Sequence, residues 1–474
     1  MVREVRVSPR WWLVCAVLVG AYAAHMAVKT VEIHRGLGTS AYDFGLYEQG
    51  VWLLSRFESP FVTLMGRNLF GDHSSFILLF LVPFYWFDPP TSFLLVVQSV
   101  VIALGAVPLF WYAKRRLRSG AAASVIALGY LIHPAVVWTN LENFHPDSFL
   151  GPLVALVLVA AAEKRWRIYW VAVVLALLVK EDVAFVLVPI GVFVALRGDR
   201  RRGVLTAVAS LGVMAVMLLV VMRSFTGVAF RNSWRIPFGG VGGFFRTVIT
   251  RPWDVVAHLV SDTRPRYLWQ VFAPLGFVAV LAPSALMTAL GVVGVNLVST
   301  FWYQYQVQYH YSLVIVPCLA FATTEALFRL KLEFRRSVVW FVALCSIVCA
   351  YFWVPLPLTS VDYQSWPPSS PQVVATAEMF ALIPPDASLA AYHPLTAQLA
   401  RRREIYSFPN PFQRSLYGPD VFAKGDRLAA ADTVQFVMLP TTLNPDDQVL
   451  WDRESGAFEE VGRNSWWVVF ERRG

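Results

Sequence analysis

Four ionisable side chains between residues 42 and 75 are the groups in this chain best suited to chemistry. Asp43 and Glu48 occur in the run Tyr-Asp-Phe-Gly-Leu-Tyr-Glu-Gln, and Asp72 and His73 occur in Asn-Leu-Phe-Gly-Asp-His-Ser-Ser. Charged groups are costly near lipid unless they are paired or neutralised. A positioned carboxylate can accept the proton of an attacking hydroxyl group. The segment therefore predicts a site with catalytic carboxylates, Asp43 and Glu48, at a membrane surface.

Each of these side chains also has a structural interpretation. Asp43 could be the N-cap of a helix that begins at Phe44, because aspartate is a favoured N-cap residue. Glu48 could lie on a solvated helix face. His73, which follows Asp72, could orient a loop, cap a helix, or bind phosphate or a metal ion. A helix cap and a reactive carboxylate are compatible roles for one aspartate.

Three later polar runs interrupt apolar sequence, at 140–147, 180–182 and 308–310. A single His-x-Asp is a weak signal for a metal site, and Lys-Glu-Asp could be a self-neutralising salt bridge at a helix break. Ionisable groups within membrane segments nevertheless indicate function. Together with His73, the side chains expected to bind substrate are Glu142, His145, Asp147, Lys180, Glu181, Asp182, Gln308 and His310.

Arginines occur in segments that we expect outside the membrane, against the usual preference of basic residues for the inside. The planar guanidinium group matches the geometry of phosphate. The arginines expected to bind the phosphate of a lipid are Arg231, Arg235, Arg264 and Arg266. The sequence identifies no cofactor, although a divalent cation would suit the acidic and histidine side chains.

The composition is that of a helical membrane protein. Of 474 residues, 57% are hydrophobic and 15% are charged, and the mean hydropathy is +0.54. Apolar stretches of about 20 residues recur, as a bundle in a bilayer requires. The net charge of +9 does not indicate nucleic acid, because the basic residues cluster in short links. All four cysteines lie in apolar stretches, so the sequence predicts neither disulfides nor a cysteine zinc site.

The basic links determine the expected topology, because such links stay on the cytoplasmic side. Placing residues 114–118, 164–167 and 197–202 inside gives about 11 crossings of the cytoplasmic membrane, with the N-terminus inside and the C-terminus outside. Residues 168–196 would form two short helices that meet at 180–182, just below the outer surface. This topology brings the candidate residues to the outer face.

Three parts of the chain are expected. Residues 1–356 form the bundle, in which the outer loop 30–75 carries the site and 76–87 is re-entrant or interfacial. Residues 357–383 are a proline-rich linker, and 384–474 form a small extracytoplasmic α/β domain that could recognise an acceptor or stabilise the bundle. Short apolar runs and polar turns predict its elements: strands at 388–392, 404–408, 433–439 and 466–470, and a helix at 395–402.

The motifs Tyr-Asp-Phe-Gly-Leu-Tyr-Glu-Gln-Gly-Val-Trp, Asn-Leu-Phe-Gly-Asp-His-Ser-Ser, Phe-His-Pro-Asp, Val-Lys-Glu-Asp and Gln-Tyr-His-Tyr resemble those of a bacterial membrane-protein family known as domain of unknown function 2079. Ile-Pro-Pro-Asp-Ala-Ser-Leu and Arg-Arg-Glu-Ile-Tyr-Ser-Phe-Pro-Asn in the tail are also similar to that family. The resemblance covers most of the chain, and it implies no settled activity.

The layout is more distantly similar to that of GT-C glycosyltransferases, which carry a catalytic acid in the first outer loop and use polyprenyl-phosphate sugars. Asp43 lies where that acid would lie. The adjacent pair of acids that is usual in the class is absent, since Glu48 follows five residues later. This second resemblance is architectural and works by analogy.

These observations give one preferred function and two alternatives. The preferred function is an inverting transfer of a sugar from a polyprenyl-phosphate donor to a cell-envelope glycan or protein at the outer face of the membrane. Asp43 would be the general base. The chain could instead be a transporter that uses Lys180, Glu181 and Asp182 as an ion relay, or a scaffold without catalytic activity. Membrane lipids are partners in each case.

Overall fold

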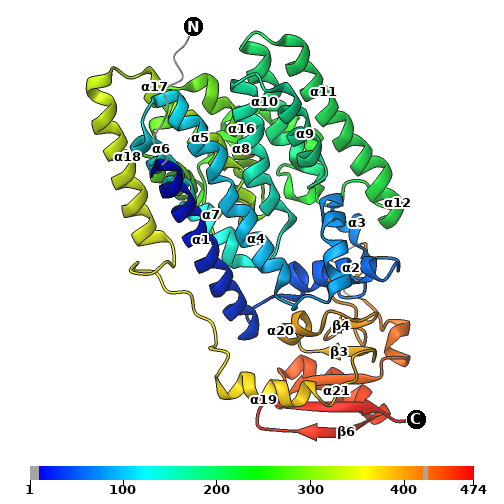
Figure 1. Ribbon diagram of the computed structural model, residues 1–474. Coiled ribbons are helices and arrows are strands. Elements are labelled where there is room, and N and C mark those ends of the chain that lie inside the picture. The colour runs from blue at the N-terminus through cyan, green and yellow to red at the C-terminus, as the bar shows by residue number, and fades with distance from the viewer. Residues whose placement is uncertain (1–9, 420–424) are drawn as a thin grey trace. The chain divides into compact units, whose positions relative to one another are not determined.

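The computed structural model describes residues 10–419 and 425–474 (Figure 1). The described chain forms two compact units. Unit 1 contains residues up to Ala27, Val96–Met217 and Asn232–Tyr363. Unit 2 contains Val28–Leu95, Leu218–Arg231 and Gln364–Gly474.

Unit 1 is built from helices. In chain order these are α1 (Arg10–Arg35, which continues into unit 2), α4 (Phe93–Leu104, which begins in unit 2), α5 (Ala106–Leu117), α6 (Gly120–Leu131), α7 (Pro134–Glu142), α8 (Leu150–Ala162), α9 (Trp166–Leu177), α10 (Ala184–Leu196), α11 (Arg200–Val216), α13 (Val241–Thr250), α14 (Pro252–Leu259), α15 (Arg264–Phe272), α16 (Pro283–Val298), α17 (Ile315–Arg329) and α18 (Leu332–Trp353).

Five helical stretches among the described residues are long and apolar enough to cross a bilayer: Arg10–Arg35, Phe93–Leu117, Arg200–Thr226, His310–Arg329 and Leu332–Trp353. The pair α6 and α7, bent by 42°, makes a sixth if it is one span, and shorter apolar helices accompany these. The expected multi-spanning helical architecture is confirmed. Residues 76–87, expected to be re-entrant or interfacial, form two short 3-10 helices, Phe76–Phe80 and Val82–Phe87.

The helix break predicted around residues 180–182 is present. Helix α9 ends at Leu177, a short 3-10 turn covers Glu181–Val183, and α10 begins at Ala184. The break has a physical reason, because three consecutive ionisable side chains cannot all face apolar neighbours in an uninterrupted helix. Lys180 consequently lies in the connection between the two helices and not within either of them.

Helices α10 and α11 lie side by side (Figure 1), and glycines form their contact. A Cβ atom added at Gly191 would lie 2.6 Å from the carbonyl oxygen of Gly203, and one added at Gly203 would lie even closer to the carbonyl oxygen of Gly191. Small residues permit such a close approach of two helix backbones in a membrane protein. The contact therefore depends on the absence of a side chain at both positions.

Gly203→Ala is expected to destabilise unit 1 by about 1–3 kcal/mol, because overpacking pushes the two helices apart. Thermal unfolding of the detergent-solubilised protein measures this as a lower Tm. Gly212→Ala is the matched control, since Gly212 lies in the same helix and has no neighbouring atom within 4 Å of an added Cβ. The control should be neutral or stabilising, because alanine has the higher helix propensity. Equal Tm values for the two variants would contradict the packing argument.

Unit 2 combines a mixed sheet with short helices. Its elements are the π-helical turn η1 (Ala41–Gly45), α2 (Leu46–Ser55), β1 (Phe61–Val62), β2 (Arg67–Asn68), α3 (Leu69–Asp72), α12 (Arg223–Thr226), α19 (Pro371–Phe380), β3 (Leu389–Ala391), α20 (His393–Thr396), β4 (Ile405–Ser407), β5 (Phe436–Pro440), α21 (Pro445–Glu454), β6 (Phe458–Arg463) and β7 (Trp467–Arg472).

The five-stranded sheet has the order β4-β3-β5-β7-β6. Strand β3 pairs in parallel with β4 and β5, whereas β7 pairs antiparallel with β5 and β6. Aromatic side chains fill the core on one face, including Phe412, Trp451 and Phe458. The four predicted strands are confirmed, whereas β6, α19 and α21 were not predicted, and the expected helix at 395–402 is only the short turn α20 followed by a 3-10 turn.

The segment that follows α1 folds with the C-terminal part of the chain inside unit 2. The Thr63 hydroxyl donates to the carbonyl oxygen of Ile405 at 2.8 Å. The Gln49 amide donates to the carbonyl oxygen of Arg402 at 3.2 Å. Because these side chains satisfy main-chain groups at the β4 edge, they fix the position of the segment on the sheet.

Candidate functional site

In unit 1, a carboxylate and two imidazoles come together from three places at the ends of helical elements. Glu142 is the last residue of α7, His145 precedes the 3-10 turn Pro146–Phe149, and His310 begins the 3-10 turn before α17. The Glu142 Oε2 atom accepts a hydrogen bond from the backbone N–H of His310 at 2.7 Å. It also lies 3.2 Å from His310 Nδ1 and 3.6 Å from His145 Nε2.

The two imidazole rings lie against each other, with centroids 3.7 Å apart and planes inclined by 24°. The backbone N–H of His145 donates to Gln98 Oε1 at 2.9 Å, which fixes this residue to α4. Burial lowers the pKa of His145 to about 3. Its ring is therefore neutral at physiological pH and retains a lone pair for a proton or a metal ion.

Lys180 lies in the α9–α10 break with acidic neighbours. Its Nζ atom is 3.5 Å from Asp147 Oδ1 and 3.9 Å from Asp182 Oδ2. The carboxylates of Asp147 and Asp182 balance the positive charge of the ammonium group, whose side chain is almost completely buried.

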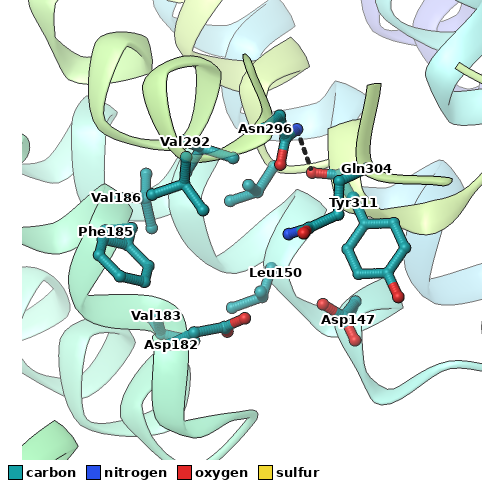
Figure 2. A pocket seen from close by; sticks show the side chains of 12 residues that line it. Asp147, Leu150, Asp182, Val183, Phe185, Val186, Val292, Asn296, Gln304 and Tyr311 are labelled. Carbon is teal, nitrogen blue, oxygen red and sulfur yellow. Dashed lines mark hydrogen bonds between the residues drawn. The ribbon is translucent and has the colours of Figure 1, made fainter. Parts of the chain in front are cut away.

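A cavity of about 40 Å³ lies beside this lysine in unit 1. Figure 2 shows the carboxylates of Asp147 and Asp182 on one side of the cavity, and Val186 and Val292 on the other. The Tyr311 ring borders the cavity, and the backbone carbonyl of Tyr311 accepts a hydrogen bond from Asn296 at 3.2 Å. The cavity thus has an acidic side and an apolar side, and it has room for a few water molecules.

Asp43 belongs to unit 2, where it is half-buried in the turn η1. The N-cap of this turn is Ser40, whose hydroxyl oxygen accepts from the backbone N–H of Tyr42 at 3.2 Å. The alternative that Asp43 is the N-cap of a helix starting at Phe44 is therefore wrong, because the helical structure begins earlier. Asp43 instead occupies the first turn, where the helix N-terminus favours a negative charge.

Glu48 is fully buried in α2 and has two partners inside unit 2. Arg401 Nε donates to its Oε1 at 2.6 Å, and the Tyr85 hydroxyl donates to its Oε2 at 2.6 Å. Burial raises the pKa of Glu48 even though Arg401 and Tyr85 oppose that effect. The interpretation of Glu48 as part of a solvated helix face is wrong, because its side chain is buried. Its cation, Arg401, comes from a distant part of the chain that no local sequence pattern identifies.

Asp72 forms a second buried ion-pair group in unit 2. Its Oδ1 atom lies 2.9 Å from Arg67 Nε and 2.6 Å from Arg231 Nη2. Burial alone would raise the pKa of Asp72, but the two arginines hold it well below its usual range. His73 follows at the end of α3 and is half-buried. Arg231, expected to bind a lipid phosphate, therefore pairs with a carboxylate of its own chain.

The other arginines expected at a lipid phosphate lie in unit 1 and have different surroundings. The guanidinium of Arg264 is buried and donates to the carbonyl oxygens of Leu297 and Ser299, both at 2.7 Å. The guanidinium of Arg235 lies 4.3 Å from the ring centroid of Phe301. Arg266 is exposed. Of these three arginines, Arg266 is the exposed one, whereas Arg235 is half-buried and Arg264 is buried.

The remaining residues expected to bind substrate are also in unit 1. Glu181 is buried in the 3-10 turn after Lys180, and Gln308 is half-buried two residues before His310. The residues that converge are therefore Glu142, His145, Asp147, Lys180, Glu181, Asp182 and His310. Asp43, Glu48, Asp72 and His73 belong to unit 2.

Sequence reasoning missed the partners Arg401, Arg67 and Tyr85. A buried glutamate needs a cation or a hydroxyl donor as its partner. This requirement predicts that a partner exists, but it does not identify which of the 40 basic residues supplies the cation. The cavity-lining amide Asn296 was also missed, because a single amide in apolar sequence forms no motif.

Unit 2 has a larger cavity of about 470 Å³, where β5 ends and β7 begins. Its lining is aromatic, with Trp366, Tyr392, Trp466 and Trp467, and Thr441 adds a hydroxyl group. Aromatic walls with a few polar groups are typical of small-ligand sites.

The apolar helical bundle and small mixed sheet define a membrane-embedded protein with a GT-C-type fold. The structure is similar to the crystal structure of ArnT from Cupriavidus metallidurans in the apo state, with a TM-score of 0.60, 15% sequence identity and 98% of each chain covered. At this identity the similarity shows the fold alone. The chain belongs to the family described as "Predicted membrane protein (DUF2079)", which matches residues 33–474. Comparison with curated proteins finds no match.

Proposed function

We propose that this protein transfers a sugar from a polyprenyl-phosphate donor to a cell-envelope glycan or protein. The observation that carries the proposal is the similarity over 98% of both chains to ArnT. The GT-C class to which that fold belongs uses polyprenyl-phosphate sugars, so the step from fold to activity is an analogy. The half-buried Asp43, which follows the first apolar helix, supports it independently.

Asp43 is the general base of the proposed reaction. Its carboxylate takes the proton of the acceptor hydroxyl as that oxygen attacks the anomeric carbon of the sugar. The bond between the anomeric carbon and the lipid phosphate oxygen breaks, and the phosphate leaves with the electron pair. Inversion at the anomeric carbon follows, because the attack and the departure occur on opposite faces.

The donor phosphate leaves as a charged group, so the proposed reaction needs a cation that stabilises the charge developing on it. In unit 2, the aromatic cavity around Trp466 is the proposed acceptor site, because flat rings offer contact area to the apolar faces of sugar rings.

A transfer assay in intact spheroplasts tests the function and its orientation together. Cells that express the protein receive a membrane-impermeant acceptor fraction from the cell envelope, and the labelled sugar on that acceptor is counted. The expected result is labelling that depends on the protein and on a polyprenyl-phosphate sugar. Trp466→Ala should raise the KM for acceptor and leave the KM for donor unchanged.

The alternatives give different results in this assay. A transporter that relays ions through Lys180, Glu181 and Asp182 would leave the acceptor unlabelled and would move an ion across proteoliposome membranes. A scaffold would show neither activity. Labelling seen only after the spheroplasts are permeabilised would place the reaction on the inner side and would overturn the proposed orientation.

A further inference from the structure

We propose that Glu142, His145 and His310 form a binding site for one divalent transition-metal ion, with Zn²⁺ as the first choice. The three residues offer one carboxylate oxygen and two imidazole nitrogens, and these ligand atoms lie within 4.8 Å of one another. Two histidines and one glutamate are a recurrent ligand set of zinc sites. The site lies wholly in unit 1 and does not depend on the proposed glycosyl transfer.

The distances match those around a tetrahedral ion. Bonds of about 2.0–2.2 Å to a tetrahedral Zn²⁺ place neighbouring ligand atoms about 3.3 Å apart. Glu142 Oε2 lies 3.2 Å from His310 Nδ1 and 3.6 Å from His145 Nε2. Two edges of the tetrahedron are therefore already formed, and only the two imidazole nitrogens need to approach each other.

A second observation also indicates a ligand. The Nε2 atom of His145 is buried and has no hydrogen-bond partner within residues 10–419 and 425–474. The His145 side chain is only 3% exposed. Buried polar atoms nearly always have a partner, because an unsatisfied one destabilises the fold. A metal ion bound to Nε2 supplies that partner.

The neighbouring hydrogen bonds hold the ligands in position. The backbone N–H of His310 donates to Glu142 Oε2 at 2.7 Å, which orients the carboxylate. Gln98 accepts from the backbone N–H of His145 at 2.9 Å and donates to the carbonyl oxygen of Asn140 at 3.2 Å. Such outer contacts are characteristic of built metal sites, because they reduce the cost of assembling the ligands.

The ligand types determine the class of metal. Imidazole nitrogen suits Zn²⁺, Fe²⁺ and other first-row ions, whereas Mg²⁺ and Ca²⁺ prefer oxygen ligands. Three protein ligands leave a coordination position for water or a substrate atom. The His310 ring lies 4.1 Å from the ring of Tyr311, which borders the cavity of unit 1. An anionic oxygen group in that cavity is the class of ligand that would suit the open position.

Metal analysis of the tag-free, full-length protein in detergent tests the proposal. The protein is stripped with a chelator, incubated with Zn²⁺, desalted and analysed by mass spectrometry for zinc. The expected content is one zinc per wild-type chain and close to none for Glu142→Gln, His145→Gln or His310→Gln. Addition of Co²⁺ in place of Zn²⁺ should give the visible absorption of tetrahedral cobalt in the wild type only.

His258→Gln is the matched control, because the His258 ring already contacts the carbonyl oxygen of Val298 at 2.8 Å and lies outside the cluster. This variant should retain one zinc. Thermal unfolding separates ligand loss from misfolding, since Zn²⁺ should raise the Tm of the wild type and the control but not of folded ligand variants. Failure of the stripped wild type to take up Zn²⁺, Fe²⁺ or Mn²⁺ would overturn the proposal, as would equal zinc in wild type and ligand variants.

Discussion

Asp43→Asn is expected to reduce sugar transfer by roughly 10²–10⁴-fold, the usual contribution of a positioned general base. Asparagine has almost the same shape as aspartate but cannot take the proton from the acceptor hydroxyl. The loss should be in kcat, with donor binding retained, because the carboxylate acts on the attacking oxygen. Initial rates in proteoliposomes, together with the binding of a labelled polyprenyl-phosphate sugar, measure both quantities.

Asp386→Asn is the control for this substitution, because Asp386 is an exposed carboxylate of the same unit. It should transfer sugar at the wild-type rate. Size-exclusion chromatography of both variants checks that the protein remains folded. An Asp43→Asn protein with full activity would eliminate Asp43 as the base, whereas a variant that no longer binds donor would assign Asp43 to positioning.

Asp72→Asn is expected to destabilise unit 2 by about 3–5 kcal/mol, the typical cost of removing one partner from a buried ion pair. The substitution leaves the guanidinium groups of Arg67 and Arg231 without their shared carboxylate. For a unit of this size, the Tm should fall by roughly 10 °C. Differential scanning fluorimetry in detergent measures the change.

The effect of Asp72 should also depend on pH. The folded-state pKa of Asp72 is held below its usual range, so the stability that it contributes is complete above the unfolded-state pKa of about 3.9 and is lost as pH falls below that value. The Tm difference between wild type and Asp72→Asn should therefore be constant near neutral pH and narrow below about pH 4.

Glu460→Gln provides a comparison, because its ion pair with Arg463 is exposed. Its effect should stay within about 1 kcal/mol, as for other surface pairs. If both substitutions changed the Tm equally, burial would not be the source of the Asp72 effect. A Tm difference that widened on acidification would contradict the direction of the Asp72 pKa shift.

The sequence predicted those features that depend on local chemistry. Apolar stretches gave the helices, and Lys180 with its acidic neighbours gave the break between α9 and α10, because charge density and helix length are local properties. The basic links placed Glu142, His145 and His310 at the ends of helices on one predicted side, and the structure brings the three side chains together. Their mutual distances needed the structure.

Contacts between distant residues could not be predicted in the same way. Glu48 looked like a solvated side chain because its partner Arg401 lies far along the chain. Strand β6 was missed because Glu459, Glu460 and Arg463 give it the composition of a loop. An edge strand can carry such charges, because one of its sides faces no neighbouring strand. Local sequence cannot distinguish that situation from a turn.

The separation of the segments that build unit 2 has a consequence for biosynthesis. Glu48 and Arg401 are 353 residues apart in the chain, and synthesis proceeds at about 5–20 residues per second. The glutamate therefore waits roughly 20–70 s for its cation after it leaves the ribosome. During that interval Glu48 lacks the guanidinium group of Arg401, and the segment that contains Asp43 lacks the sheet on which it packs. The candidate base is therefore synthesised long before its surroundings are complete. Activity should consequently appear only after translation ends, and a ribosome stalled before Arg401 should hold an inactive protein.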